Sequence, residues 1–201
     1  MTWLYKFFNI ILKPISHLFF KINVVGLENF PSDRPFVLCS NHTSISDMVF
    51  LIAFCPRQIC FMSKKEVFKF RIVAWFMRQM RAFPVDRGAR DISAIRSACN
   101  VIKRGDVLGI FPEGTRYKDF MPPRPFLPGS AFVAIKTGAD ILPVAIYKDK
   151  NVKFIRRRVT LRFGEIIKSS DLYDGKPSKE KIGEVSDALH QSITKLWELK
   201  H

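Results

Sequence analysis

Apolar and polar residues alternate along the chain in two kinds of segment. Short apolar runs of strand length recur, and between them lie longer segments in which apolar side chains return at helical spacing. We predict strands at 21–25, 36–39, 59–62, 82–85, 107–111, 141–147 and 159–163, and helices over 46–54, 65–78, 90–103, 129–138 and 178–199. Such alternation is typical of an α/β fold. We expect a single α/β domain with a mixed, largely parallel sheet flanked by helices.

The first 22 residues are dense in large apolar and aromatic side chains, but three lysines interrupt them and Pro14 falls in the middle. A helix that spans a bilayer needs about 20 mostly uncharged apolar residues, so this segment does not qualify. It also lacks the small-residue cleavage site of a signal peptide. Proline would kink or break a helix here. We therefore predict that residues 1–22 form two short helices in the membrane interface, with a core-packed helix pair as the alternative.

The chain has 201 residues, of which 47% are hydrophobic, and this is enough for one core of ordinary size. Lys and Arg outnumber Asp and Glu by 33 to 18, which gives a formal net charge of +15. Such an excess predicts an anionic partner: nucleic acid, an anionic membrane or a phosphorylated substrate. Basic residues concentrate in 56–90 and 147–168. Beside nineteen phenylalanines, these zones favour a membrane surface, where each basic residue contributes about 1 kcal/mol.

One candidate for chemistry is the segment 41–47, Asn-His-Thr-Ser-Ile-Ser-Asp. In a regular helix five residues correspond to a rotation of about 500°, so His42 and Asp47 would point apart. The intervening Ser and Thr residues favour a loop and a helix N-cap, which would let the two side chains meet. Asp47 would then accept the Nδ1 proton of His42 and direct Nε2 towards a substrate, as in general base catalysis. Taken alone, the spacing more often reflects a packed histidine and a capping aspartate.

The second candidate is the segment 111–116, Phe-Pro-Glu-Gly-Thr-Arg, which ends a predicted strand in a turn. Gly114 permits a positive φ or a close backbone approach. Arg116 can bind a phosphate through two hydrogen bonds. Glu113 can orient an acceptor hydroxyl or hold Arg116. A structural turn with a surface ion pair is the alternative.

Three predicted strands are each followed by one of the candidate side chains, namely His42, Arg87 and Glu113. Ligands of open parallel sheets bind outside the carboxyl ends of the strands, so we expect the three to open onto one crevice. A base, an orienting carboxylate and an anion anchor suit transfer of an acyl group to a hydroxyl on a phosphorylated acceptor.

Other chemistries are disfavoured by what the sequence lacks. The cysteines at 39, 55, 60 and 99 form no C-x-x-C pair, and no zinc pattern is present, so we expect a reducing compartment without disulfides. There is also no G-x-S-x-G elbow, P-loop or dinucleotide fingerprint. Without a covalent nucleophile, direct attack of an acceptor hydroxyl on a thioester is the simpler mechanism.

Four segments, in order, resemble the sequence blocks of the glycerolipid acyltransferases. The segment 41–47 resembles the N-H-x-S-x-x-D block, 81–87 the second block, 111–116 the third block nearly letter for letter, and 141–146 the fourth. The resemblance spans about residues 21–165 and points to the small bacterial 1-acylglycerol-3-phosphate acyltransferases.

The resemblance implies a role for each site residue. His42 would be the catalytic base, Asp47 would orient it, and Lys64 would stand near the thioester and stabilise the oxyanion. The remaining residues would form or shape the site for the acceptor phosphate: Arg87, Glu113, Gly114, Thr115 and Arg116. No metal or bound cofactor is implied, because an acyl-carrier-protein or coenzyme A thioester serves as co-substrate.

The resemblance therefore predicts an enzyme of phospholipid biosynthesis that moves a fatty acyl group to lysophosphatidic acid and produces phosphatidic acid. Residues 23–201 would form the acyltransferase domain, and residues 1–22 would hold it peripherally on the cytoplasmic face of the cell membrane. Leu127 stands where many relatives carry a lysine, so glycerol-3-phosphate or another lysolipid remains an alternative acceptor. A non-catalytic basic protein that binds anionic lipid or nucleic acid is a remote alternative, because charge does not explain four ordered blocks. We expect no nucleic-acid partner.

Overall fold

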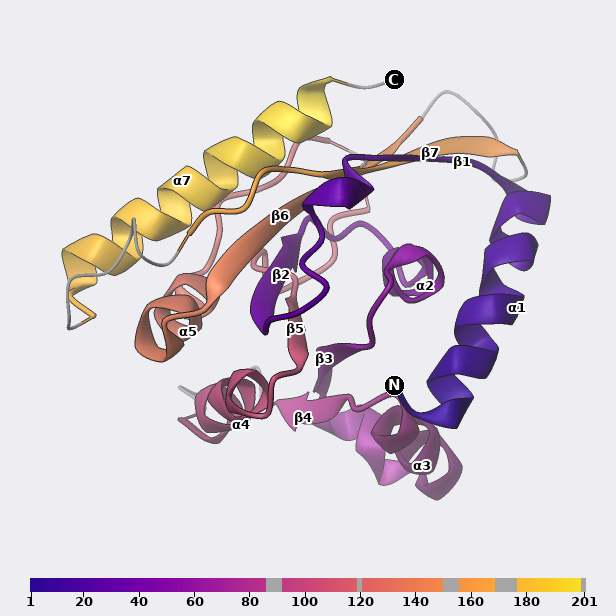
Figure 1. The fold of residues 1–201 in the computed structure, drawn as a ribbon, viewed down its shortest axis with the longest axis horizontal. Coiled ribbons are helices and arrows are strands. Elements are labelled where there is room, and N and C mark those ends of the chain that lie inside the picture. The colour runs from indigo at the N-terminus through magenta and orange to yellow at the C-terminus, as the bar shows by residue number, and fades with distance from the viewer. Residues whose placement is uncertain (86–91, 119–120, 150–155, 169–176, 200–201) are drawn as a thin grey trace.

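The structure is a computed structural model, and it describes residues 1–85, 92–118, 121–149, 156–168 and 177–199. These residues build one seven-stranded sheet in the order β1-β7-β6-β2-β5-β3-β4 (Figure 1). The strands are β1 (Phe20–Val25), β2 (Phe36–Ser40), β3 (Ile59–Lys64), β4 (Phe83–Val85), β5 (Val107–Ile110), β6 (Asp140–Lys148) and β7 (Arg157–Phe163). The α-helices are α1 (Trp3–Phe19), α2 (Ser46–Phe54), α3 (Arg71–Gln79), α4 (Ile92–Lys103), α5 (Gly129–Thr137) and α7 (Lys179–Glu198), and short 3-10 helices are η1 (Leu27–Asn29) and η2 (Lys65–Lys69).

The sheet is mixed and largely parallel, which confirms the predicted α/β class. Strands β2 to β6 all run in one direction, whereas β7 pairs antiparallel with β6 and parallel with β1. Five strands therefore bring their carboxyl ends to the same edge of the sheet. Ligands of parallel sheets bind at such an edge.

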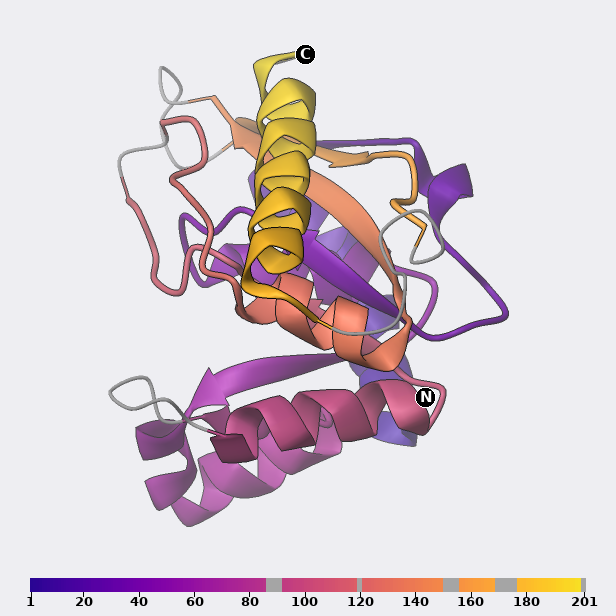
Figure 2. The same cartoon turned by 90° about the vertical axis from the view of Figure 1, so that its left-hand side faces the viewer.

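Helices cover both faces of the sheet (Figures 1 and 2). Along β2, Val37 and Cys39 pack with residues of α4, α5 and α7, whereas Phe36 and Leu38 pack with α2 on the opposite face. Successive side chains of a strand point to opposite faces, so a strand that is buried on both faces shows a continuous apolar run. This arrangement explains why short apolar runs located the central strands.

The N-terminal segment forms one helix over Trp3–Phe19, so the prediction of two pieces separated at Pro14 is wrong. Pro14 is exposed, and so is Ile10, whose carbonyl lacks the amide partner that a residue other than proline at position 14 would supply. The opposite side of α1 packs on α2. Tyr5 is fully buried there, and the Asn9 side chain donates to the Ile52 carbonyl at 2.7 Å. Tertiary contacts thus keep the helix continuous through the proline.

A second difference concerns residues 65–78, which the sequence pattern predicts as one helix. The structure has η2 and then α3, separated by Phe70 in an extended conformation. The Phe70 carbonyl accepts the Ala74 amide at 2.7 Å and so begins α3. Within the described ranges, no helix combines the length and apolar character needed to cross a bilayer.

Two glycines with positive φ allow a test of the packing at the edge of the sheet. Gly26 joins β1 to η1 at φ +75°, and a Cβ there would lie 2.2 Å from the Phe163 carbonyl oxygen. Gly138 ends α5 at φ +65°, but a Cβ there would meet nothing within 4 Å. Alanine at either position adds backbone strain of about 1–2 kcal/mol, whereas only Gly26→Ala adds a clash with backbone.

We expect Gly26→Ala to lower the free energy of unfolding by about 1 kcal/mol or more beyond the loss caused by Gly138→Ala, as measured in urea titrations. Equal losses in the two variants would contradict the close approach of Gly26 to β7.

Candidate active site

The loop between β2 and α2 brings His42 and Asp47 together. His42 Nδ1 lies 2.9 Å from Asp47 Oδ2. The same oxygen accepts the backbone amides of Thr43 at 2.7 Å and Ser44 at 2.8 Å. Asp47 is fully buried in the first turn of α2, where the helix dipole favours a carboxylate. The contact predicted from the sequence is therefore present, and it depends on the non-helical loop between the two residues.

The imidazole of His42 is held from two sides. Its ring stacks on Phe111 with the ring centroids 3.9 Å apart and an interplanar angle of 14°. Because Nδ1 faces Asp47, Nε2 points away from the carboxylate. With the proton on Nδ1, the ring donates to Asp47 and keeps a lone pair on Nε2, which is the state that a general base requires.

The turn after β5 holds the backbone of His42. Glu113 Oε1 accepts the His42 amide at 2.8 Å, and the Tyr117 amide donates to the His42 carbonyl at 3.0 Å. Glu113 is only 7% exposed. From the sequence we expected Glu113 to orient an acceptor hydroxyl or to hold Arg116. Its contact with the His42 backbone was not expected.

Gly114 makes the turn possible, because it adopts φ +70° and a Cβ there would lie 2.5 Å from Leu127 Cδ1. The Leu127 amide donates to the Pro112 carbonyl at 2.8 Å. Leu127 therefore packs over this turn. Thr115 and Arg116 follow and are exposed.

Lys148, the last residue of β6, is a member of the site that the sequence analysis missed. Its side chain is 3% exposed, and its ammonium group forms an ion pair with Asp47 Oδ1. The ammonium also donates to the hydroxyls of Thr43 at 3.0 Å, Ser44 at 2.7 Å and Ser46 at 3.2 Å. The buried carboxylate is thus bonded to the imidazole through one oxygen and to a lysine through the other.

The sequence carried one signal for this lysine. Lys148 directly follows the apolar run 141–147, and in a parallel sheet the end of that strand lies near the end of the run 36–39. A charged side chain at that position faces the loop that begins with His42.

The buried ion pair shifts the pKa values of both partners. Burial by itself would raise the pKa of the Asp47 carboxyl, but the hydrogen bond from His42, the charge and hydrogen bond of Lys148, and the Ser44 amide together hold it below its ordinary value. Burial lowers the pKa of Lys148, and the negative charge of Asp47 opposes that change. Each charge in the pair therefore offsets part of the desolvation of the other.

A basic cavity of about 620 Å³ adjoins the loop of His42. Its lining consists of Phe20, Thr43, Ser44, Ile45, Ser46, Arg116, Lys118, Lys148 and Arg157. Arg116 thus lies next to the loop, as expected for an anion anchor. Lys64 is the last residue of β3, in register with Val85, and Arg87 lies outside the described residues.

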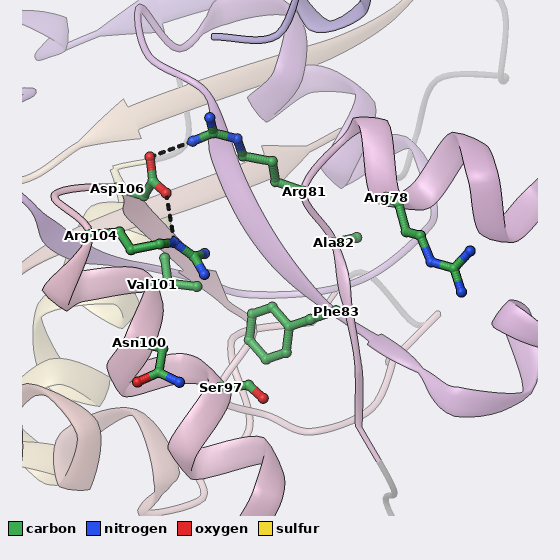
Figure 3. A pocket seen from close by; sticks show the side chains of 9 residues that line it. All are labelled: Arg78, Arg81, Ala82, Phe83, Ser97, Asn100, Val101, Arg104 and Asp106. Carbon is green, nitrogen blue, oxygen red and sulfur yellow. Dashed lines mark hydrogen bonds and ion pairs between the residues drawn. The ribbon is translucent and has the colours of Figure 1, made fainter.

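A second cavity, of about 850 Å³, is separate from this site (Figure 3). Among its lining residues, Ala82 precedes β4 and Asp106 precedes β5, at the amino ends of these strands. Asp106 bonds Arg81 at 2.6 Å and Arg104 at 3.4 Å, while Arg78 points away from Asp106 in Figure 3. Two of its three arginines are therefore engaged by an acidic partner, and it shares no lining residue with the cavity beside His42.

Comparisons with known proteins match this fold and its sequence blocks. The family described as Acyltransferase matches residues 21–147. A 1-acyl-sn-glycerol-3-phosphate acyltransferase of Bacillus subtilis (strain 168) is 33% identical over 196 residues, which are 96% of each chain. Another, from Streptococcus pneumoniae, is 33% identical over 170 residues, which cover 83% of this chain and 62% of that protein.

A solved structure is also similar. The crystal structure of the 1-acyl-sn-glycerophosphate (LPA) acyltransferase PlsC from Thermotoga maritima has a TM-score of 0.75 at 29% identity, and the match covers 96% of this chain and 79% of that one. The chain therefore belongs to the acyltransferase family and is an enzyme. Among the residues that the structure describes, no group of three His, Cys, Asp or Glu side chains is arranged to hold a metal ion.

The buried ion pair predicts an acid-sensitive contribution to stability. Asp47→Asn leaves the Lys148 ammonium buried opposite a neutral amide, so we expect the free energy of unfolding to fall by about 3–5 kcal/mol at pH 7. A carboxyl whose pKa is lowered on folding stabilises the protein above its unfolded pKa of about 3.9 and loses this effect as the pH falls through the folded value. The difference in the free energy of unfolding between the wild-type protein and Asp47→Asn should therefore narrow below about pH 4.

Urea titrations at a series of pH values measure this difference. Asp187→Asn, at an exposed position of α7, is the matched control and should change stability by no more than about 0.5 kcal/mol. A constant difference from pH 7 to pH 3 would mean that the ionised form of Asp47 does not stabilise the fold.

Proposed function

We propose that this enzyme transfers a fatty acyl group from an acyl thioester to the free hydroxyl of lysophosphatidic acid and produces phosphatidic acid. The observation that carries the proposal is the contact between His42 and Asp47 beside a basic cavity. The names of the Bacillus and Thermotoga relatives support the same reaction. Acyltransferases of this family use the thioester as a co-substrate and act without a cofactor.

The geometry supports direct transfer through a general base. Nε2 of His42 accepts the proton of the acceptor hydroxyl while the hydroxyl oxygen attacks the thioester carbonyl carbon. Asp47 stabilises the imidazolium that forms, and Lys64 stabilises the negative charge on the carbonyl oxygen, a contribution of about 2.7–4 kcal/mol for one donor. The tetrahedral intermediate then collapses, the C–S bond breaks, and the imidazolium returns the proton to the leaving thiolate. A positioned base of this kind contributes about 10²–10⁴-fold to the rate.

We assign the acceptor phosphate to the cavity beside the loop, where Arg116 lies with Lys118 and Arg157. Arg116 offers two parallel donors to a phosphate, which is a stronger contact than that of a neutral donor. By the resemblance, Arg87, Gly114 and Thr115 would complete this phosphate site.

The same chemistry serves other acceptors, such as glycerol-3-phosphate or another lysolipid. The cavity supports lysophosphatidic acid, because apolar Phe20 and Ile45 line it together with the basic residues, so that a phosphate and a lipid chain could be accommodated side by side.

We expect His42→Ala to abolish turnover, with at least about a 10²-fold loss, because the acceptor hydroxyl then lacks its base. The assay uses lysophosphatidic acid with either an acyl-carrier-protein or a coenzyme A thioester, in detergent, with products identified by mass. His17→Ala, at an exposed position of α1, is the matched control and should keep full activity.

A fully active His42→Ala variant would contradict the mechanism. Wild-type protein that acylates glycerol-3-phosphate or another lysolipid faster than lysophosphatidic acid would instead contradict the acceptor alone.

We further propose that the enzyme docks peripherally on the cytoplasmic face of the cell membrane through residues 1–22, with 23–201 as the acyltransferase domain. The outer face of α1 supports this proposal, since Trp3, Ile10 and Leu18 are 70%, 71% and 72% exposed. Lys6 and Lys13 lie exposed beside them. Large apolar side chains flanked by lysines are typical of helices in the membrane interface.

Helix α3 adds to this apolar surface. It lies beside the start of α1 (Figure 1), where Phe8 and Phe76 contact each other with ring centroids 5.2 Å apart. Ile72 is 83% exposed and Trp75 is 52% exposed. The face of α1 that packs on α2 resembles the core-packed alternative, so the helix combines an inner face that packs on the domain with an outer face suited to lipid.

We expect the triple variant Trp3→Ser, Ile10→Ser, Leu18→Ser to bind vesicles that contain phosphatidylglycerol at least about tenfold more weakly, because burial of each large apolar side chain contributes about 1.5–3 kcal/mol when complete. Sedimentation with the vesicles measures this binding. Ile92→Ser and Leu199→Ser, at positions 73% and 60% exposed outside α1, form the control and should not change it. Unchanged binding of the triple variant would rule out α1 as the docking helix.

A further inference from the structure

We propose that Lys148 is a positioning residue of the acyl transfer, because its buried ammonium fixes the carboxylate that orients His42. This inference deepens the proposed function and rests on it. Lys148 lies outside the four sequence blocks that carry the resemblance.

The two oxygens of Asp47 have separate partners. Oδ2 faces His42 Nδ1 at 2.9 Å and also accepts two backbone amides of the loop, whereas Oδ1 faces Lys148 Nζ. Rotation of a carboxylate about its last torsion meets only a broad, two-fold barrier. A partner on each oxygen therefore determines which one meets the imidazole and at what angle.

The lysine itself is held in place from several sides. Four oxygens surround Nζ, from the Asp47 carboxylate and three hydroxyls of the loop and of α2, and the side chain is 3% exposed. The Asn41 side chain also donates to the Ile146 carbonyl at 3.0 Å and accepts the Ile146 amide at 2.7 Å. Ile146 and Lys148 lie two residues apart on β6. The two hydrogen bonds between Asn41 and Ile146 therefore fix the end of the strand against the loop that carries His42.

The charge of Lys148 also balances that of Asp47, because the ammonium lies on the far side of the carboxylate from the imidazole. Other charged groups face this cluster: Glu113 behind the His42 backbone, and Arg116, Lys118 and Arg157 across the adjoining cavity. These groups stay in place when Lys148 alone is changed.

A pair of variants tests the proposal. Lys148→Met keeps the length of the side chain and removes the charge, whereas Lys148→Arg keeps the charge. We expect Lys148→Met to lower kcat about tenfold or more, because the carboxylate that orients the base loses its partner. KM for lysophosphatidic acid should stay within about twofold, since Lys148 lines the cavity but its ammonium is bonded to Asp47 and to three hydroxyls. Lys148→Arg should restore most of kcat.

Activity can be lost because the protein misfolds or because the base is poorly positioned. The double variant Asp47→Asn, Lys148→Met, which removes both buried charges, distinguishes these two causes. It should recover stability relative to either single variant but not activity. Wild-type kcat in Lys148→Met would overturn the proposal. So would a raised KM at constant kcat, which would make Lys148 a binding residue, or a loss of activity equal to the loss of folded protein. If His42→Ala is inactive while Lys148→Met behaves like wild type, only this inference fails and the proposed function stands.

Discussion

One buried carboxylate connects the parts of the molecule that form the site. Asp47 lies in the first turn of α2, accepts two amides of the loop after β2 and the imidazole of His42, and pairs with the lysine that ends β6. A charge that is removed from water persists only if it is paired and hydrogen-bonded. The loop, the helix and the strand must therefore all be in their native positions before this carboxylate is stable. Replacement of such a pair by two apolar residues is often neutral, whereas removal of one partner is strongly destabilising.

The register of the parallel strands determines which residues share the site. Strand β2 lies between β5 and β6, with Cys39 opposite Ile110 and Ser40 opposite Val144. Residues just beyond these pairs emerge together at the carboxyl edge. The short loop after β2 and the glycine turn after β5 then place an imidazole over a phenyl ring, while a carboxylate supports its backbone. The sheet thus supplies the framework, and two tight connections supply the chemistry.

Local patterns in the sequence were sufficient for the fold class and for the central contact of the site. Continuous apolar runs mark strands that are buried on both faces, and the rotation per residue of a helix showed that His42 and Asp47 meet only across a loop. These inferences depend on a few neighbouring residues, and a single sequence contains that information.

The features that the sequence did not reveal depend on contacts between distant segments. Pro14 was expected to divide the first helix, but packing of α1 on α2 outweighs its local effect. The pairing of Lys148 with Asp47 joins the end of β6 to the first turn of α2, and the hydrogen bond that Glu113 accepts from the His42 amide depends on the position of the turn after β5. Neither secondary-structure propensity nor the spacing of residues along the chain contains information on the distance between Lys148 and Asp47 or between Glu113 and His42. The role of Arg87 stays a prediction from the resemblance, because that residue lies outside the described ranges.

Two hydrogen bonds join Asn41, directly after β2, to Ile146 of β6, which lies 105 positions later in the chain. β2 and β6 are neighbours in the central part of the sheet. Ribosomes deliver a protein from its N-terminus, and domains generally fold as units. The imidazole and its carboxylate therefore leave the ribosome long before the strand that completes their surroundings. Until β6 pairs with β2, the centre lacks the Lys148 ammonium, and β2 can pair only with β5. The complete geometry of the centre therefore forms only after β6 has been synthesised, so a shorter nascent chain carries the imidazole and its carboxylate without the contacts of the finished enzyme.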